Sequence, residues 1–198
     1  TAAASYDTTT TTTTTTTTYQ GAQSTEPTMM YFESRLVLPI LNLLRETIFP
    51  ILTHFSLRWS SSVVNSASFR IGRSSLPSVL KFNYTLRKLS IVSCDGGDEL
   101  AGLVASALGR ANNSLQSLDL TDNGITDQGA NLLGKMLSIG LSGLNDLRLD
   151  RNHLGDKGAY YIARSLPTAA PHFKSLSMDG CGVGDEGGMA LSKFVRLS

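Results

Sequence analysis

A 29-residue spacing recurs through the C-terminal part of the chain and limits its possible folds more than any other feature. Four columns of residues follow this spacing without an insertion. The columns are Leu86, Leu115, Leu144 and Phe173; Leu89, Leu118, Leu147 and Leu176; Ile91, Leu120, Leu149 and Met178; and Cys94, Asn123, Asn152 and Cys181. The agreement predicts four equivalent structural units, at residues 86–114, 115–143, 144–172 and 173–198.

Each copy changes its hydrophobic period halfway. In the second copy, Leu118 and Leu120 alternate with polar residues, which is typical of a strand with one buried face. Further on, Ala130, Leu133 and Leu137 fall on one face of a helix. Aspartates stand where each helix should begin, and a carboxylate there can accept free backbone N–H groups. These aspartates are Asp98, Asp127, Asp156 and Asp185.

Glycines follow three of these aspartates by two positions, at Gly129, Gly158 and Gly187. We expect the neighbouring copy to pack so closely there that a side chain would not fit. No single copy can bury its own leucines, so the copies must stack. The sequence therefore predicts an α/β solenoid with parallel strands on a concave face and helices on a convex face.

The segments 123–130 (Asn-Gly-Ile-Thr-Asp-Gln-Gly-Ala) and 152–159 (Asn-His-Leu-Gly-Asp-Lys-Gly-Ala) give the pattern a family character. Residues 86–198 resemble leucine-rich repeats of the ribonuclease-inhibitor-like subfamily, which also occur in intracellular innate-immune receptors, Ran GTPase-activating proteins and tropomodulins. The resemblance implies the solenoid fold. It does not identify a partner, because function does not follow from fold.

Residues 1–85 are divided differently. Residues 1–28 contain the threonine run 8–18 and have little to bury, so we expect a disordered tail. Residues 29–85 are interpreted as a helical cap over the first repeat, because an open solenoid exposes its last layer. They could include one degenerate repeat, since Leu57 and Ser61 precede Leu86 and Ser90 by the same 29-residue spacing. In that alignment Ser60 and Ser62 would occupy two buried leucine positions.

Composition and motifs argue against several functions. A net charge of +1 without a basic tail argues against nucleic-acid binding. The apolar stretch 36–57 contains two prolines and the charged pair Arg45 and Glu46, which argues against a membrane span. We find no metal, cofactor or nucleophile motif, and therefore expect no enzyme activity, cofactor or small-molecule substrate.

The two cysteines lie three copies apart, so their Cα atoms should be separated by roughly 14 Å or more. That is too far for a disulfide, which needs Cα atoms within about 7 Å. The sequence predicts two free, buried thiols whose role matches that of Asn123 and Asn152, namely hydrogen bonding to backbone at the end of the strand. Free thiols favour a reducing compartment, and we expect a cytoplasmic protein.

The concave face is the predicted binding site, because its strand residues point away from the leucines. Asp119 should lie beside Arg148, an opposite-charge pair. Asp150 should lie beside Asp179, a like-charge pair that nothing in the predicted fold requires. We expect a protein partner, one with a basic surface, to contact this face. The candidate contact residues are Asp119, Asp122, Asp146, Arg148, Asp150, Arg151 and Asp179.

The predicted function is that of an intracellular protein-interaction module or scaffold. Two alternatives stay open. One is a GTPase-activating regulator of a small GTPase, as the resemblance to Ran GTPase-activating proteins would imply, with Arg151 as the residue to test. The other is an F-box-type substrate receptor, suggested by the pairs Leu38-Pro39 and Ile48-Phe49.

Overall fold

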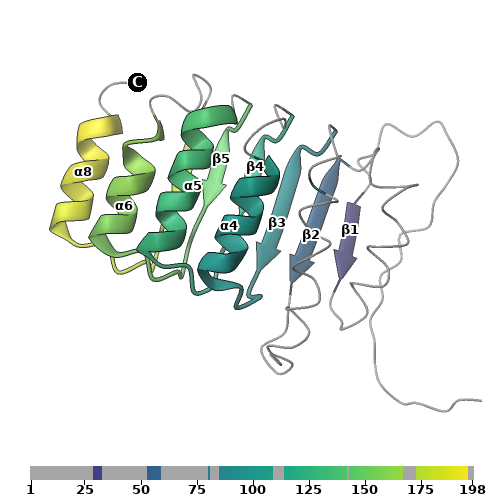
Figure 1. Ribbon diagram of the computed structural model, residues 1–198, viewed down its shortest axis with the longest axis horizontal. Helices are drawn as coiled ribbons and strands as arrows, with labels where there is room; N and C mark the ends of the chain where they lie inside the picture. The colour runs from purple at the N-terminus through teal and green to yellow at the C-terminus, as the bar shows by residue number, and fades with distance from the viewer. Residues whose placement is uncertain are drawn as a thin grey trace, which may run out of the picture.

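A computed structural model describes residues 29–32, 53–58, 80, 85–108, 114–141, 143–166 and 173–195. In these residues strands and helices alternate from β3 onward, and Figure 1 shows the helices side by side along one face of the sheet. The elements are β1 (Met29–Phe32), β2 (His54–Arg58), β3 (Lys88–Val92), α4 (Gly97–Leu108), β4 (Ser117–Asp119), α5 (Asp127–Gly140), β5 (Asp146–Arg148), α6 (Gly155–Ala163), β6 (Ser175–Ser177) and α8 (Asp185–Val195).

The strands form one parallel sheet in the order β1-β2-β3-β4-β5-β6. From β3 to β6 the register follows the predicted period, because Lys88 pairs with Ser117, Ser117 with Asp146, and Asp146 with Ser175. A chain that joins neighbouring parallel strands must return to its starting edge, so each helix runs opposite to the strands. The predicted α/β repeat solenoid is confirmed.

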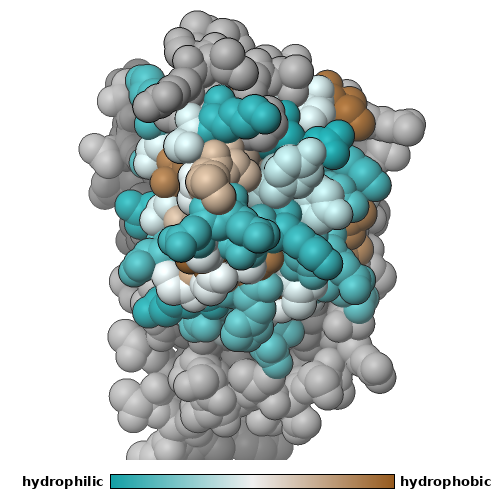
Figure 2. All heavy atoms as spheres, turned by 90° about the vertical axis from the view of Figure 1, so that its left-hand side faces the viewer, coloured by the Kyte–Doolittle hydropathy of each residue, from teal (hydrophilic) through white to brown (hydrophobic). Residues whose placement is uncertain are grey.

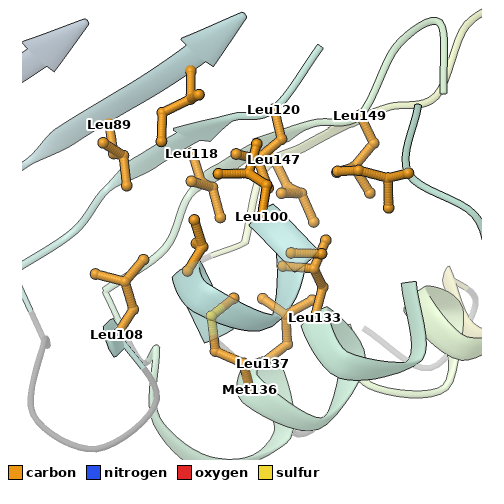
Figure 3. Packing of buried hydrophobic residues seen from close by; sticks show 14 of the residues in the cluster. Leu89, Leu100, Leu108, Leu118, Leu120, Leu133, Met136, Leu137, Leu147 and Leu149 are labelled. Carbon is orange, nitrogen blue, oxygen red and sulfur yellow. The ribbon is translucent and has the colours of Figure 1, made fainter. Parts of the chain in front are cut away.

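The leucine columns form the layer between sheet and helices. Leu118 and Leu120 of the second copy are 0% exposed, and Leu147 of the third is 1% exposed. Leu133, Met136 and Leu137 reach them from α5, as Figure 3 shows. Each fully buried leucine contributes about 1.5–3 kcal/mol relative to an exposed one. The period in the sequence is therefore the period of the core.

The asparagine column links the copies by hydrogen bonds. The Asn123 amide donates to the carbonyls of Ile91 (2.7 Å) and Leu120 (2.9 Å), while its oxygen accepts from the Cys94 N–H (3.1 Å). Asn152 repeats this arrangement one copy later, with its oxygen accepting from the Asn123 N–H (3.1 Å). These buried side chains satisfy backbone groups that strand pairing leaves free.

Cysteines occupy both ends of that column. The Cys94 thiol donates to the Val92 carbonyl (3.3 Å), and the Cys181 thiol donates to the Leu149 carbonyl (3.0 Å). Both thiols are free and buried, as the sequence predicted.

In the described part of the chain, only two of the four aspartates at the helix starts, Asp98 and Asp156, accept backbone N–H groups, and these groups belong to the following copy rather than to their own helix. One oxygen of Asp98 accepts from the N–H groups of Thr126 (2.8 Å) and Gly129 (2.9 Å) at the start of α5. Asp156 accepts in the same way from Gly184 (2.7 Å) and Gly187 (2.9 Å) at the start of α8. The start of α6 differs, because the Gly158 N–H donates to the Leu154 carbonyl (3.0 Å). We call the Asp98 and Asp156 arrangements carboxylate clamps.

The glycines at the helix starts confirm the predicted close packing. A Cβ atom on Gly129 would lie 2.4 Å from the Asp98 carboxylate oxygen, and one on Gly187 would lie 2.7 Å from that of Asp156. Only glycine fits there without displacing the clamp.

The alignment predicted for the N-terminal repeat is wrong. β2 pairs with β3 through His54 and Lys88, so a 34-residue offset replaces the predicted 29-residue one. This register places Phe55 opposite Leu89, and Phe55 is 1% exposed. An aromatic side chain supplies apolar area that the serines of the predicted alignment lack, which favours the longer offset.

The sheet also extends further toward the N-terminus than expected. Within the segment predicted as a helical cap, β1 pairs with β2, starting with Met29 opposite His54. Leu80, within the same predicted cap, is helical and buried. The threonine-rich tail and the remainder of the predicted cap lie outside the described residues, as do the segments on which the F-box alternative rests.

Candidate functional site on the strand face

The strand residues that alternate with the leucines form one polar surface, which we call the strand face. It lies on the side of the sheet opposite α4, α5, α6 and α8 (Figure 1). Its side chains are exposed or half-buried, as predicted. They are Lys88, Ser90, Ser117, Asp119, Asp146, Arg148, Ser175 and Ser177. Val92 and Thr121 hold the next alternating position in the first and second copies, but they are only 5% and 8% exposed and contribute little surface.

Asp119 and Arg148 are register partners on β4 and β5, as the sequence predicted. One Asp119 carboxylate oxygen, however, accepts from the hydroxyl (2.6 Å) and the backbone N–H (3.0 Å) of Thr121. Among the described residues the two side chains form no ion pair, and Arg148 is exposed. Asp119 therefore shapes the end of its own strand, while Arg148 keeps its donors available.

Asp150 has a structural role that the sequence did not reveal. Its carboxylate accepts from the Ser177 hydroxyl (2.5 Å) and from the backbone N–H of Asp179 (2.8 Å). The fold therefore uses Asp150 itself, whatever the effect of the like-charge pair with Asp179, because these bonds hold the end of β6 against the third copy. Hydrogen bonds to a carboxylate are stronger than those between neutral groups, which offsets the neighbouring Asp179 charge.

Asp122 is bonded within the fold as well, since its carboxylate accepts from the Ser93 hydroxyl (2.7 Å). It belongs to a column of residues with left-handed backbone after each strand. The φ angles are 55° at Ser93, 56° at Asp122, 55° at Arg151 and 65° at Gly180. Gly180 and Asp122 could have predicted this column from the sequence. Glycine and aspartate adopt the left-handed conformation more readily than most residues.

Four of the seven candidate residues keep free side chains. Asp146, Arg148, Arg151 and Asp179 make no side-chain hydrogen bond or ion pair with other described residues, and all but the half-buried Asp146 are exposed. Two lie on β5, and the other two lie in the turns that follow β5 and β6. The structure thus separates the candidates into three carboxylates that hold the fold together and four groups that can meet a partner.

The chemistry of the buried thiol at this end gives no sign of catalysis. Burial raises the pKa of the Cys181 thiol, and the nearby Asp150 and Asp179 carboxylates raise it further, against backbone N–H groups that lower it. A cysteine nucleophile needs a lowered pKa, so this thiol is poorly suited to attack. Among the described residues no group of three or more His, Cys, Asp or Glu side chains could hold a metal ion.

Comparisons with known proteins agree with this geometry. The family described as Leucine Rich repeat matches residues 111–134, 144–163 and 169–192. No curated protein matches the sequence. In the part of the chain that the structure describes, no helix is both long and apolar enough to cross a membrane.

Two solved structures have similar folds. Leiomodin-1 actin-binding site 2 matches with a TM-score of 0.58 and 20% identity, over 79% of this chain and 86% of that one. The tropomodulin C-terminal domain of Caenorhabditis elegans matches with a TM-score of 0.57 and 14% identity, over 80% of this chain and 90% of that one. The leucine-rich-repeat model matches three segments of the stack, and the stacked copies have the fold of a leucine-rich-repeat solenoid.

Proposed function

We propose that this chain is a non-enzymatic protein-interaction module that binds its partner through the strand face. The observation that carries the proposal is the set of free charged groups on that face, Asp146, Arg148, Arg151 and Asp179, held in place by a rigid hydrogen-bonded frame. Rigid presentation lowers the entropy cost of binding, and exposed arginines are frequent in interfaces.

The partner we propose has a basic surface with some acidic groups. From β4 to the turn after β6, the strand face and its following turns carry five aspartates, at 119, 122, 146, 150 and 179, against Arg148 and Arg151. Asp146 and Asp179 would contact such a partner directly, and the bonded carboxylates would add to the acidic character of the surface. Acidic groups on the partner would be matched by the two arginines.

The finer classification belongs to the same proposal. We propose that the repeats are of the ribonuclease-inhibitor-like type, on the strength of the 29-residue period and the strand-turn-helix order of each copy. We also propose a scaffold role in the cytoplasm, which the two free thiols support, because they remain reduced there.

The test compares two variants in an affinity purification. Asp146→Lys/Asp179→Lys reverses the two free carboxylates of the strand face. Glu99→Lys/Glu186→Lys makes the same charge change at exposed helix positions, in the first turns of α4 and α8. We expect the proteins retained by the natural chain to be lost with the first variant and kept with the second. Equal retention by both variants would contradict binding through the strand face.

Actin is the first single partner to assay, because one of the two similar structures is an actin-binding site of leiomodin-1. Binding of purified actin by the natural chain, lost in Asp146→Lys/Asp179→Lys, would identify the partner. If actin does not bind, the partner of the strand face is to be sought among the other proteins retained in the purification.

Regulation of GTP hydrolysis is a second candidate, supported by one observation. Arg151 is exposed, its guanidinium has no partner among the described residues, and the left-handed backbone fixes its position. An arginine presented in this way can stabilise charge in phosphoryl transfer. Faster GTP turnover by a small GTPase with the natural chain, but not with Arg151→Ala, would support this alternative.

A further inference from the structure

The two edges of the solenoid carry opposite charges. Because helices run opposite to strands, the ends of the strands and the starts of the helices share one edge, at the bottom of Figure 1. The first turn of every described helix contains an aspartate there. At the upper edge the strands begin and the helices end, and the charged side chains there are mainly cationic.

Besides Lys88 of the strand face, five exposed cations lie toward this upper edge, and we call these five the basic rim. They belong to two columns of the repeat. Lys135, Arg164 and Lys193 share one repeat position, on or directly after α5, α6 and α8, and Arg87 and Lys174 share the position before a strand. The repeat thus places cations on both the helix side and the strand side of one edge.

Stabilisation of the fold explains only some of the five cations of the basic rim. Cations at helix C-termini interact favourably with the helix dipole, which explains Arg164 and Lys193. Arg87 and Lys174 precede strands and gain nothing from a helix. The Arg164 guanidinium lies 5.9 Å from the centre of the Tyr160 ring, and none of the five cations forms an ion pair with another described residue.

Cations at this edge also raise the electrostatic potential around His54 of β2. The pKa of His54 is lowered mainly by its burial, and also by the charges of Lys88 and Arg87. The carboxylates of the described residues lie mainly toward the opposite edge, and Asp146 at the start of β5 is the exception. The positive potential therefore reaches solvent from the basic rim.

We propose that the basic rim binds an acidic protein segment, on a surface separate from the strand face. Arg87 and Lys174 lie three strands apart, roughly 14 Å by the usual strand spacing. The intervening positions of their column are the uncharged Gln116 and Asn145. Such widely spaced cations match separate carboxylates better than a nucleic acid, which carries a charge about every 1.7 Å.

An apolar side chain on the same edge adds to this match. Ile139, one turn after Lys135 on α5, is 73% exposed. An exposed isoleucine beside cations suits a segment that mixes acidic and aliphatic residues. A flexible segment of this kind can reach both the helix side and the strand side of the edge.

The experiment measures fluorescence anisotropy with the full chain and a labelled acidic peptide in which glutamate alternates with leucine. Arg164→Glu should weaken binding by about five- to tenfold, because it replaces an attraction by a repulsion. Lys157→Glu, an exposed cation on the same helix but near its start, makes the same change of charge and should stay within about twofold. Raising the salt from about 0.05 M to about 0.2 M should weaken the natural complex.

Several results would overturn the proposal. They are no binding of the acidic peptide at low salt, equal weakening by Arg164→Glu and Lys157→Glu, or tighter binding of a poly-dT oligonucleotide or of phosphatidylserine vesicles. Arg87→Glu/Lys174→Glu changes only the strand side of the rim and leaves α6 untouched. It should weaken peptide binding by a similar factor. Asp146→Lys/Asp179→Lys should leave peptide binding no weaker, so that failure of the rim and failure of the strand face can be told apart.

Discussion

The third and fourth copies have nearly the same hydrophobic pattern and yet differ in burial. Leu144, Leu147 and Leu149 of the third copy are 0–1% exposed. Their equivalents in the fourth copy, Phe173, Leu176 and Met178, are only partly buried. The end of the stack is seen in Figure 2, where brown and tan patches interrupt a mainly hydrophilic surface. The apolar side chains of one copy are therefore fully buried only where a further copy packs against them.

A leucine-to-alanine substitution should therefore lower the free energy of unfolding more in the third copy than in the fourth. Leu147→Ala should lower the free energy of unfolding by about 3–5 kcal/mol, because it opens a cavity between two closed layers. Leu176→Ala should cost about half as much, since its neighbours can relax into a partly open site. Urea denaturation of both variants measures the difference. Equal losses would mean that the fourth copy is as tightly closed as the third.

The asparagine column should show the same contrast in its hydrogen bonds. Asn152→Ala removes bonds to the carbonyls of Leu120 and Leu149 and to the N–H groups of Asn123 and Ile125. Leaving such buried groups unpaired should cost about 2–4 kcal/mol. Cys181→Ala at the open end removes one thiol donor and should cost about 1 kcal/mol. Denaturation curves in which Cys181→Ala costs as much as Asn152→Ala would contradict this ordering.

Two glycines at successive positions of the repeat, Gly129 in the second copy and Gly188 in the fourth, should respond to alanine with opposite signs. Gly129→Ala forces a Cβ atom onto the Asp98 clamp and should destabilise by about 1–3 kcal/mol. Gly188→Ala, in α8, meets no atom within 4 Å and should stabilise the helix by about 0.5–1 kcal/mol. Thermal melting of the two variants is the measurement, and a loss of stability in Gly188→Ala would show that its site is not open.

The smallest expected effect depends on pH and on the Cys181 thiol. Because burial raises the pKa of this thiol in the folded state, the folded protein holds the proton more tightly than the unfolded chain. Its contribution to stability is complete below the ordinary thiol pKa and is lost as the pH rises above it. The stability of the natural chain should therefore fall more between about pH 8 and about pH 10 than that of Cys181→Ser. Parallel pH profiles for the two proteins would exclude this contribution.

The sequence predicted the parts of the molecule that repeat. The strand register from Lys88 to Ser175, the buried columns and the free thiols follow from spacing alone, because every copy meets the same neighbour. The β2 register could not be predicted in this way, since no second copy shares its 34-residue offset. Only the burial of Phe55 identifies the alignment that the chain adopts.

The candidate site was predicted in position but not in detail. Alternation placed Asp119, Asp146 and Arg148 on the strand face, and register made Asp119 and Arg148 neighbours. Which carboxylates are bonded depends on side-chain rotamers and on turns between copies, and a one-dimensional pattern does not contain these. Asp150 illustrates the limit, because its partner Ser177 lies almost a full repeat away and on another strand.

The carboxylate clamps have a consequence for how such a chain can change its length. Asp98 and Asp156 lie two copies apart, and the border between them, at the start of α6, is built differently. Removing one copy would bring together two surfaces that were never matched. Removing two adjoining copies would preserve the match, so the interchangeable block of this solenoid is a pair of repeats.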